Sequence, residues 1–242
     1  MRYEILLRLD KPELDIEYRS KILSLFKSIL TNYQEGRFFS EFYDKGSTNK
    51  GICFAVQFVD PVFYKEKITL ASTTLKLTIA VEQQRTAFIF LNAFLNMRNK
   101  THPISTDNAV IIESIRPIEE RIVHGDMAVY HFLSPLCLRL HERSGNKDTY
   151  ISCKHDNFVS VLIENIRSQV PTYNVGLLSS LNTLQVEASQ CKKTVVKHYG
   201  CSIEVTIGTI VFQGDTPLLN YIGKMNLGSR KSAGFGLTQL CN

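Results

Sequence analysis

Apolar positions along the chain follow two different periods, in an order that occurs twice. In the first half, two-residue alternation and 3.6-residue spacing follow each other as strand, helix, strands, helix and strand. The strand-like runs are residues 2–9, 51–58, 67–73, 74–83 and 109–118, and the helix-like runs are residues 16–33 and 84–99. We expect the two runs between residues 67 and 83 to form a hairpin pair. This order predicts a βαββαβ unit.

The clearest helical signal lies in residues 16–33. Its apolar residues recur every three or four positions and so form one stripe on a helix. The stripe comprises Ile16, Ile22, Leu23, Phe26, Ile29 and Leu30. A stripe of this kind is typical of an amphipathic helix with one buried face.

The second half of the chain shows the same order of patterns. A strand over residues 128–140 is interrupted at Pro135, which indicates an edge or a bend. A helix follows with Asp156 or Asn157 as its cap and Pro171 beyond its end. Three further strands, a short helix and a last strand then cover residues 183–190, 193–199, 201–214, 215–225 and 234–240. The sequence therefore predicts two tandem βαββαβ units that meet near residues 118–126.

Composition is that of an ordinary globular protein, with 44% hydrophobic and 21% charged residues among 242. Six scattered cysteines without a CxxC pair indicate reduced thiols. The first ten residues carry charges and no long apolar run, so we expect no signal peptide. The most apolar helical run, residues 86–97, is too short to span a bilayer. We therefore expect a cytoplasmic protein without a membrane partner.

Positive charge is concentrated in the last quarter of the chain. The net charge is +5, and from residue 188 onward six Lys or Arg face two acids, which places +4 there. The cations are Lys192, Lys193, Lys197, Lys224, Arg230 and Lys231. A distribution of this kind indicates an anionic partner or, alternatively, a solvated basic face.

A glycine-rich segment, residues 221–242, contains the last three of these cations. Gly223 and Gly228 have the spacing of a nucleotide-binding loop, but Ser229 and Arg230 stand where Lys and Ser/Thr belong. We therefore do not expect a nucleotide site. Glycines still allow close backbone approach to a phosphate, while Arg and Lys supply counter-charge. A tight, basic helix-to-strand turn is the alternative interpretation.

Two motifs carry a resemblance to a known family. The stretch GKMNLGSRKSAGFGL, residues 223–237, resembles the C-terminal glycine-rich signature of the CRISPR-associated endoribonucleases of the RAMP superfamily, which cut precursor CRISPR RNA within its repeats. The stretch FLSPLCLRL, residues 132–140, resembles their Ser-Pro motif. With the order of elements and the chain length, the resemblance extends over the whole chain. It implies an α+β fold of two tandem ferredoxin-like (RRM-like) domains, residues 1–121 and 122–242.

The resemblance also implies where RNA binds. The RNA-binding residues that we expect are Gly223, Lys224, Gly228, Ser229, Arg230, Lys231, Ser232, Gly234 and Gly236, with Lys192, Lys193 and Lys197 extending the track. Contacts of this kind to phosphates add affinity that depends on salt and not on base sequence.

Catalysis in this family needs no metal or cofactor, because the ribose 2′-OH attacks the adjacent phosphate. Many members use a histidine between the first helix and the second strand, but residues 32–58 contain none. Tyr43 stands near that position, Lys50 stands where a lysine often follows, and Tyr33 and Lys45 are nearby. We predict these four as catalytic candidates, although packing for Tyr43 and phosphate binding for the lysines are the alternatives. An unperturbed tyrosine, with a pKa of about 10, is a poor base at neutral pH.

Several alternatives remain open at this point. Phe38, Phe39 and Phe42 are expected to anchor the first helix, with base stacking as the alternative. The six histidines lie elsewhere and are expected to be surface or core residues. The chain could also be a repeat-RNA-binding subunit with weak or no cleavage, or a scaffold within an effector complex. CRISPR repeat RNA is the expected partner, and other CRISPR-associated proteins or a second copy of the chain could join it.

Overall fold

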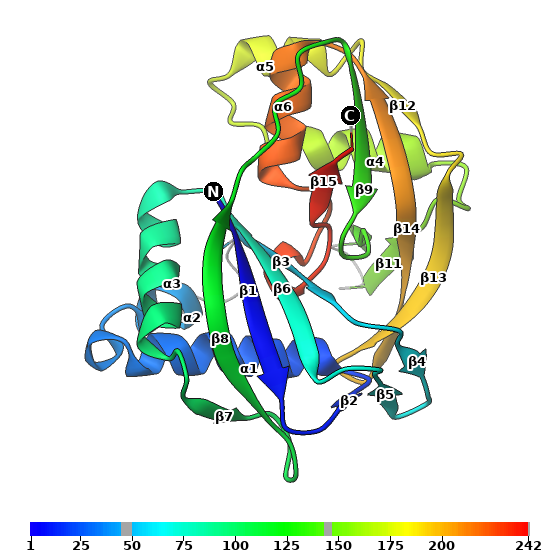
Figure 1. The fold of residues 1–242 in the computed structure, drawn as a ribbon. Helices are drawn as coiled ribbons and strands as arrows, with labels where there is room; N and C mark the ends of the chain where they lie inside the picture. Colours follow the sequence, from blue (N-terminus) through cyan, green and yellow to red (C-terminus); the bar gives the residue numbers. More distant parts are fainter. Residues whose placement is uncertain (45–49, 143–146, 242) are drawn as a thin grey trace. The chain divides into compact units, whose positions relative to one another are not determined.

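The computed structural model describes residues 1–44, 50–142 and 147–241 (Figure 1). Contacts group the chain into two compact units. The first contains Met1–Glu120 and Lys197–Cys201, and the second contains Arg121–Val196 and Ser202–Asn242. No helix in this described part is long and apolar enough to cross a membrane.

An antiparallel sheet forms the first unit, in the order β3-β6-β1-β8-β7. Its strands are β1 (Arg2–Leu9), β3 (Ile52–Gln57), β6 (Thr74–Val81), β7 (Thr101–Pro103) and β8 (Ala109–Ile118). Helices α1 (Tyr18–Asn32) and α3 (Gln84–Asn96) cover one face of the sheet (Figure 1). The four long strands have the order of a ferredoxin-like fold, so the predicted βαββαβ unit is confirmed.

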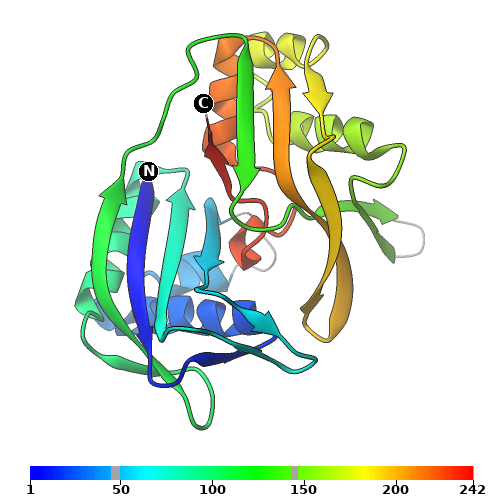
Figure 2. The same ribbon diagram turned by 45° about the vertical axis from the view of Figure 1, so that its right-hand side comes forward.

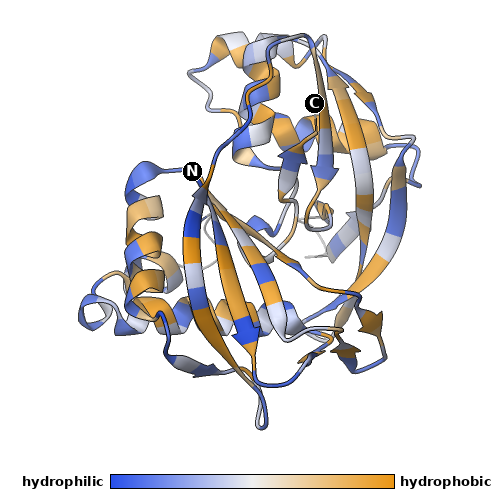
Figure 3. Cartoon of the chain, in the orientation of Figure 1, coloured by the Kyte–Doolittle hydropathy of each residue, from blue (hydrophilic) through white to orange (hydrophobic). Residues whose placement is uncertain are grey.

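The core of the first unit lies between this sheet and its two helices. Alternate residues of β1 are buried, as the two-residue period predicts. Figure 3 colours the same strand by hydropathy. On α1 the centre of the predicted stripe, Phe26, makes edge contacts with the rings of Phe54 and Phe94, at centroid distances of 5.1 and 5.7 Å. Ile16 and Leu23 lie at the margin of the stripe and are only partly buried.

One predicted pairing in this unit is wrong. Strand β5 (Lys67–Thr69) does not pair with β6 but with β2 (Glu13–Asp15) and β4 (Val62–Phe63) in a small separate sheet. Strand β6 already has β1 on one edge and β3 on the other, so neither edge is free. Ile68 of β5 is instead fully buried opposite Leu14.

The second unit repeats the topology (Figure 2). Its sheet has the order β12-β14-β9-β15, and β13 also pairs with β14. The strands are β9 (Met127–Phe132), β12 (Gln185–Glu187), β13 (Cys191–His198), β14 (Cys201–Gln213) and β15 (Thr238–Leu240). The helices are α4 (Phe158–Arg167), α5 (Val175–Ser180) and α6 (Thr216–Met225). The predicted second βαββαβ unit is therefore confirmed.

Pro135 marks the place where the predicted strand 128–140 divides. Strand β9 ends at Phe132, and β10 (Leu138–Glu142) pairs with β11 (Lys147–Ile151) in a two-stranded ribbon. Asn157 stands at the start of α4 as predicted, but its side chain makes no capping hydrogen bond. The remaining short helices are η1 (Gln34–Gly36), α2 (Phe39–Tyr43) and η2 (Lys231–Ala233).

Candidate RNA interface and catalytic residues

The Ser-Pro motif and the glycine-rich segment pack against each other in the second unit. The Leu237 amide donates to Ser134 Oγ at 3.0 Å, and the Gly236 amide donates to the Pro135 carbonyl at 2.9 Å. The Ser229 amide donates to the Cys137 carbonyl at 2.7 Å. The bend at Pro135 therefore directs carbonyl groups at the glycine-rich segment and holds its backbone in place.

The glycines of this segment are required by packing within the protein. A Cβ at position 223 would lie 2.5 Å from the hydroxyl of Tyr130, and one at position 228 would lie 2.6 Å from the Cys137 carbonyl oxygen. Gly236 has φ +76°, and a Cβ there would collide with the carbonyl oxygen of Leu227. In the described structure these close approaches are made to protein atoms. Contact of the glycines with RNA stays a prediction.

The cations of the glycine-rich segment differ in exposure. Lys224 is exposed at the end of α6, whereas Lys231 is 7% exposed and its Nζ donates to the Met225 carbonyl at 2.7 Å. The ammonium of Lys231 thus satisfies a carbonyl at the end of α6, and we assign it a structural role in place of the predicted RNA contact. Ser229 and Ser232 are half-buried.

Arg230 is held in an uncommon backbone conformation just before η2. It has φ +58°, in the left-handed region that non-glycine residues seldom adopt. Its Nη2 donates to the Tyr150 hydroxyl at 2.7 Å and lies 3.8 Å from Asp148 Oδ2. About 30% of its side chain remains exposed. Arg230 is therefore ordered by the β10–β11 ribbon and still accessible to a ligand.

The three lysines of β13 differ in their contacts, and their binding to RNA stays a prediction. Lys192 and Lys193 are exposed in the second unit, and Lys193 Nζ lies 2.7 Å from Glu204 Oε2. Lys197 is grouped with the first unit, where its Nζ donates to the Lys65 carbonyl at 3.2 Å. Only Lys192 among the three has no ion pair or hydrogen bond assigned to its side chain in the described part of the chain.

Two of the four catalytic candidates meet at the ring of Tyr43, the last residue of α2. The ammonium of Lys50 lies 3.8 Å from the centroid of this ring, and that of Lys27 lies 5.4 Å from it. Both are cation–π contacts, which stabilise a partly desolvated ammonium. The ring of Tyr43, and not its hydroxyl, is therefore the part that holds Lys50.

Burial shifts the pKa values of both Tyr43 and Lys50. It raises the pKa of the Tyr43 phenol above its ordinary value, and Tyr199 adds to the effect. Burial lowers the pKa of Lys50, and the neighbouring charge of Lys27 lowers it further. A phenol with a raised pKa is a weaker candidate for proton transfer at neutral pH, whereas a lysine with a lowered pKa is a better one.

The other two catalytic candidates gain no support from the geometry. Tyr33 stacks on Phe38 with ring centroids 5.9 Å apart, and its hydroxyl accepts a hydrogen bond from Gln34 Nε2 at 3.2 Å. Lys45 lies outside the described residues. Phe42 is buried in the core, so the expected anchoring role of the aromatic cluster is confirmed for it. Within residues 1–44, 50–142 and 147–241, no three His, Cys, Asp or Glu side chains are grouped to bind a metal.

Sequence reasoning missed a polar group on the β10–β11 ribbon. Arg139, His141, Asp148 and Tyr150 are brought together by the pairing of the two strands and meet Arg230 there. The alternation of polar residues at positions 139 and 141 is the signal that could have indicated it. The strand pairing that completes the group is not visible in the sequence.

Two ferredoxin-like units in tandem, with a basic glycine-rich segment seated on a Ser-Pro bend, define a protein of the tandem RNA-recognition-motif class. The family model described as CRISPR associated protein Cas6, C-terminal, matches residues 118–240, just over half of the 242-residue chain. The chain therefore belongs to the Cas6 family. Members of this family are endoribonucleases that process CRISPR repeat RNA, so the predicted family and class of activity are confirmed.

Solved structures share the fold along the full chain. One is described as a RAMP protein binding different RNA substrates, with 16% identity, a TM-score of 0.80 and 100% of both chains covered. A Cas6-related protein from Pyrococcus furiosus has 14% identity and a TM-score of 0.81, with 100% of this chain and 98% of that chain covered. A Cas6 product complex has 15% identity, a TM-score of 0.71 and full coverage of both chains. A search of curated protein sequences found no match.

Proposed function

We propose that this chain binds CRISPR repeat RNA and cleaves precursor transcripts by attack of a ribose 2′-OH on the adjacent phosphate, without a metal ion. The observation that carries the proposal is the family match over residues 118–240, which contains the Ser-Pro bend and the glycine-rich segment in direct contact. Lys224, Arg230 and Lys192 are among the accessible cations that this unit presents to the RNA backbone. Cleavage takes place in the cytoplasm, where the transcripts are made.

Lys50 is the residue to which we assign the chemistry in the first unit. The step needs an acceptor for the 2′-OH proton, a cation for the charge that develops on the phosphoryl group and an acid for the leaving 5′ oxygen. An ammonium held on the face of Tyr43, with a lowered pKa, supplies the last two, and the proton of the 2′-OH passes to water. Tyr43 acts through Lys50 as a positioning residue.

A cleavage assay on repeat RNA in excess EDTA tests the proposal. The wild-type protein should give a 2′,3′-cyclic phosphate and a new 5′-OH end, and an RNA with a 2′-deoxy nucleotide at the cut should stay intact. Tight binding without any product would instead establish the second candidate, a repeat-binding subunit that assembles with other CRISPR-associated proteins or with a second copy of the chain. The absence of histidine from residues 32–58 favours that candidate.

A further inference from the structure

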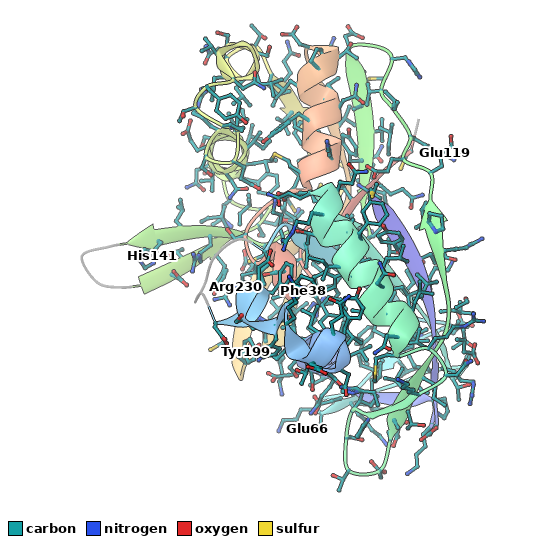
Figure 4. The ribbon with its side chains drawn as sticks, turned by 90° about the vertical axis from the view of Figure 1, so that its left-hand side faces the viewer. Phe38, Glu66, Glu119, His141, Tyr199 and Arg230 are labelled. Carbon is teal, nitrogen blue, oxygen red and sulfur yellow. The ribbon has the colours of Figure 1, made fainter. Side chains whose placement is uncertain are left out.

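The two-stranded ribbon β10–β11 presents one polar face. In its register Arg139 lies opposite Tyr150, and His141 lies opposite Asp148. Residues two apart on a strand point to the same side, and cross-strand partners share that side. Arg230, from the glycine-rich segment, reaches the same face by donating to the Tyr150 hydroxyl. Figure 4 labels Arg230 and, on the ribbon, His141.

Asp148 stands at the centre of this face and organises it. Its Oδ1 lies 2.9 Å from His141 Nδ1, and its Oδ2 lies 3.1 Å from Arg139 Nη1. The hydrogen bond from His141 is the main cause of a lowered pKa at Asp148, and Arg139 adds to it. Asp148 is therefore a carboxylate, which can only accept hydrogen bonds.

The ionised carboxylate of Asp148 determines which nitrogen of the His141 imidazole carries the proton. Because Asp148 accepts, Nδ1 of His141 carries the proton and donates it. The other nitrogen, Nε2, is then an acceptor in the neutral ring. About 42% of the His141 side chain is exposed, so this acceptor is available to a ligand that offers a hydroxyl group.

The two arginines keep several donors for a ligand, although Nε of Arg230 is buried and is not among them. An arginine has five N–H donors, and the described contacts occupy one on Arg139, with Asp148, and one on Arg230, with Tyr150. Both guanidinium groups lie within 3.8 Å of the same oxygen of Asp148, so they are close enough together to bind one phosphate. Because two arginines face one carboxylate, these three side chains together carry a net positive charge.

We propose that this ribbon face is an RNA-backbone site, at which Arg139 and Arg230 bind a phosphate and His141 Nε2 accepts a hydrogen bond from a ribose 2′-OH. A ribonucleotide carries a phosphate and, close to it, a 2′-OH that can donate a hydrogen bond, whereas DNA lacks the 2′-OH. Asp148 positions His141 and Arg139 without touching the RNA. The inference rests on the proposed function, since repeat RNA is the ligand.

Equilibrium binding of repeat RNA tests this site, with a 2′-deoxy nucleotide at the cut so that no cleavage occurs. Arg139→Ala is compared with Arg167→Ala, which removes an arginine of similar exposure that pairs with Glu164 in the same unit. His141→Ala is compared with His131→Ala, which removes an exposed histidine that contacts Thr209. Each variant is measured at several salt concentrations, and with all-RNA and all-DNA forms of the repeat.

Arg139→Ala should weaken RNA binding about tenfold and reduce the slope of log affinity against log salt by roughly 0.7 to 1. His141→Ala should lower the preference for RNA over DNA by about threefold. Asp148→Asn should lower the same preference without weakening overall affinity, because it loosens His141 and also removes a negative charge. The two control variants should match the wild type.

The outcomes separate this site from the proposed function. If the wild-type protein binds repeat RNA and the ribbon variants match their controls, the ribbon site is wrong and the proposed function stands. If the wild-type protein does not bind repeat RNA, both are wrong.

Discussion

The ammonium of Lys50 lies over the ring of Tyr43, 3.8 Å from its centroid, in the region where many family members carry a histidine. Under the proposed mechanism, this contact lets Tyr43 position Lys50 while only Lys50 transfers a proton. Burial partly desolvates the ammonium of Lys50, and the aromatic ring stabilises it by a cation–π contact. Burial also raises the pKa of the Tyr43 phenol, which is therefore harder to ionise.

Cleavage should therefore depend on the ring of Tyr43 and on the ammonium of Lys50. Lys50→Ala should lower the single-turnover rate by about 10²-fold or more, the usual contribution of a positioned acid. Tyr43→Phe should stay within about threefold of the wild type, because the cation–π contact survives. Lys11→Ala, which removes an exposed lysine paired with Asp107, serves as the control. A large loss in Tyr43→Phe would show that the hydroxyl takes part in the reaction.

The pH dependence of cleavage should report the charge of Lys27. Lys50 acts as an acid only while protonated, so the rate should fall as pH rises through its lowered pKa. Lys27→Ala removes a positive charge that lowers this pKa, and the fall should move to higher pH. Lys21→Ala, on the same helix, is the matched control. An unchanged pH profile in Lys27→Ala would exclude Lys50 as the titrating group.

Two glycines with similar φ angles should respond differently to substitution by alanine. Gly236 and Gly200 have φ of +76° and +74°, but a Cβ meets the Leu227 carbonyl only at position 236 and has open space at position 200. Gly200→Ala should cost about 1–2 kcal/mol of unfolding free energy from backbone strain alone. Gly236→Ala should cost a further 1–3 kcal/mol, roughly, from overpacking. Urea denaturation measures both, and equal losses would contradict the packing explanation.

The two lysines of the glycine-rich segment should separate stability from RNA binding. Lys231→Met leaves the Met225 carbonyl without this donor, so it should lower the unfolding free energy by about 1–3 kcal/mol. Lys224→Met changes an exposed side chain and should leave stability within about 0.5 kcal/mol. Only Lys224→Met should reduce the salt dependence of repeat-RNA binding. Denaturation and salt titrations of the two variants test this, and a reduced salt slope in a folded Lys231→Met would restore Lys231 to the RNA interface.

The sequence correctly predicted elements whose signal is local. The helical stripe around Phe26 and the alternation along residues 2–9 each follow from a period that one segment carries by itself. The predicted pairing of residues 67–73 with 74–83 was wrong, because pairing depends on which strand edges remain free after the sheet has formed. The polar face of β10–β11 was missed for the same reason, since Arg139 and Tyr150 become neighbours only through strand register.

By itself, the sequence determined the two βαββαβ units, the basic glycine-rich segment and the resemblance that leads to the Cas6 family. The tertiary structure decided what each residue of that segment does. Protein atoms lie so close to Gly223, Gly228 and Gly236 that a Cβ there would collide with them. Lys231 is buried and donates to the Met225 carbonyl, whereas Arg230 donates to the Tyr150 hydroxyl. Residue type and spacing specify charge and backbone freedom, but burial and hydrogen-bond partners come from segments distant in sequence, and these decide whether a lysine supports the fold or remains available for RNA.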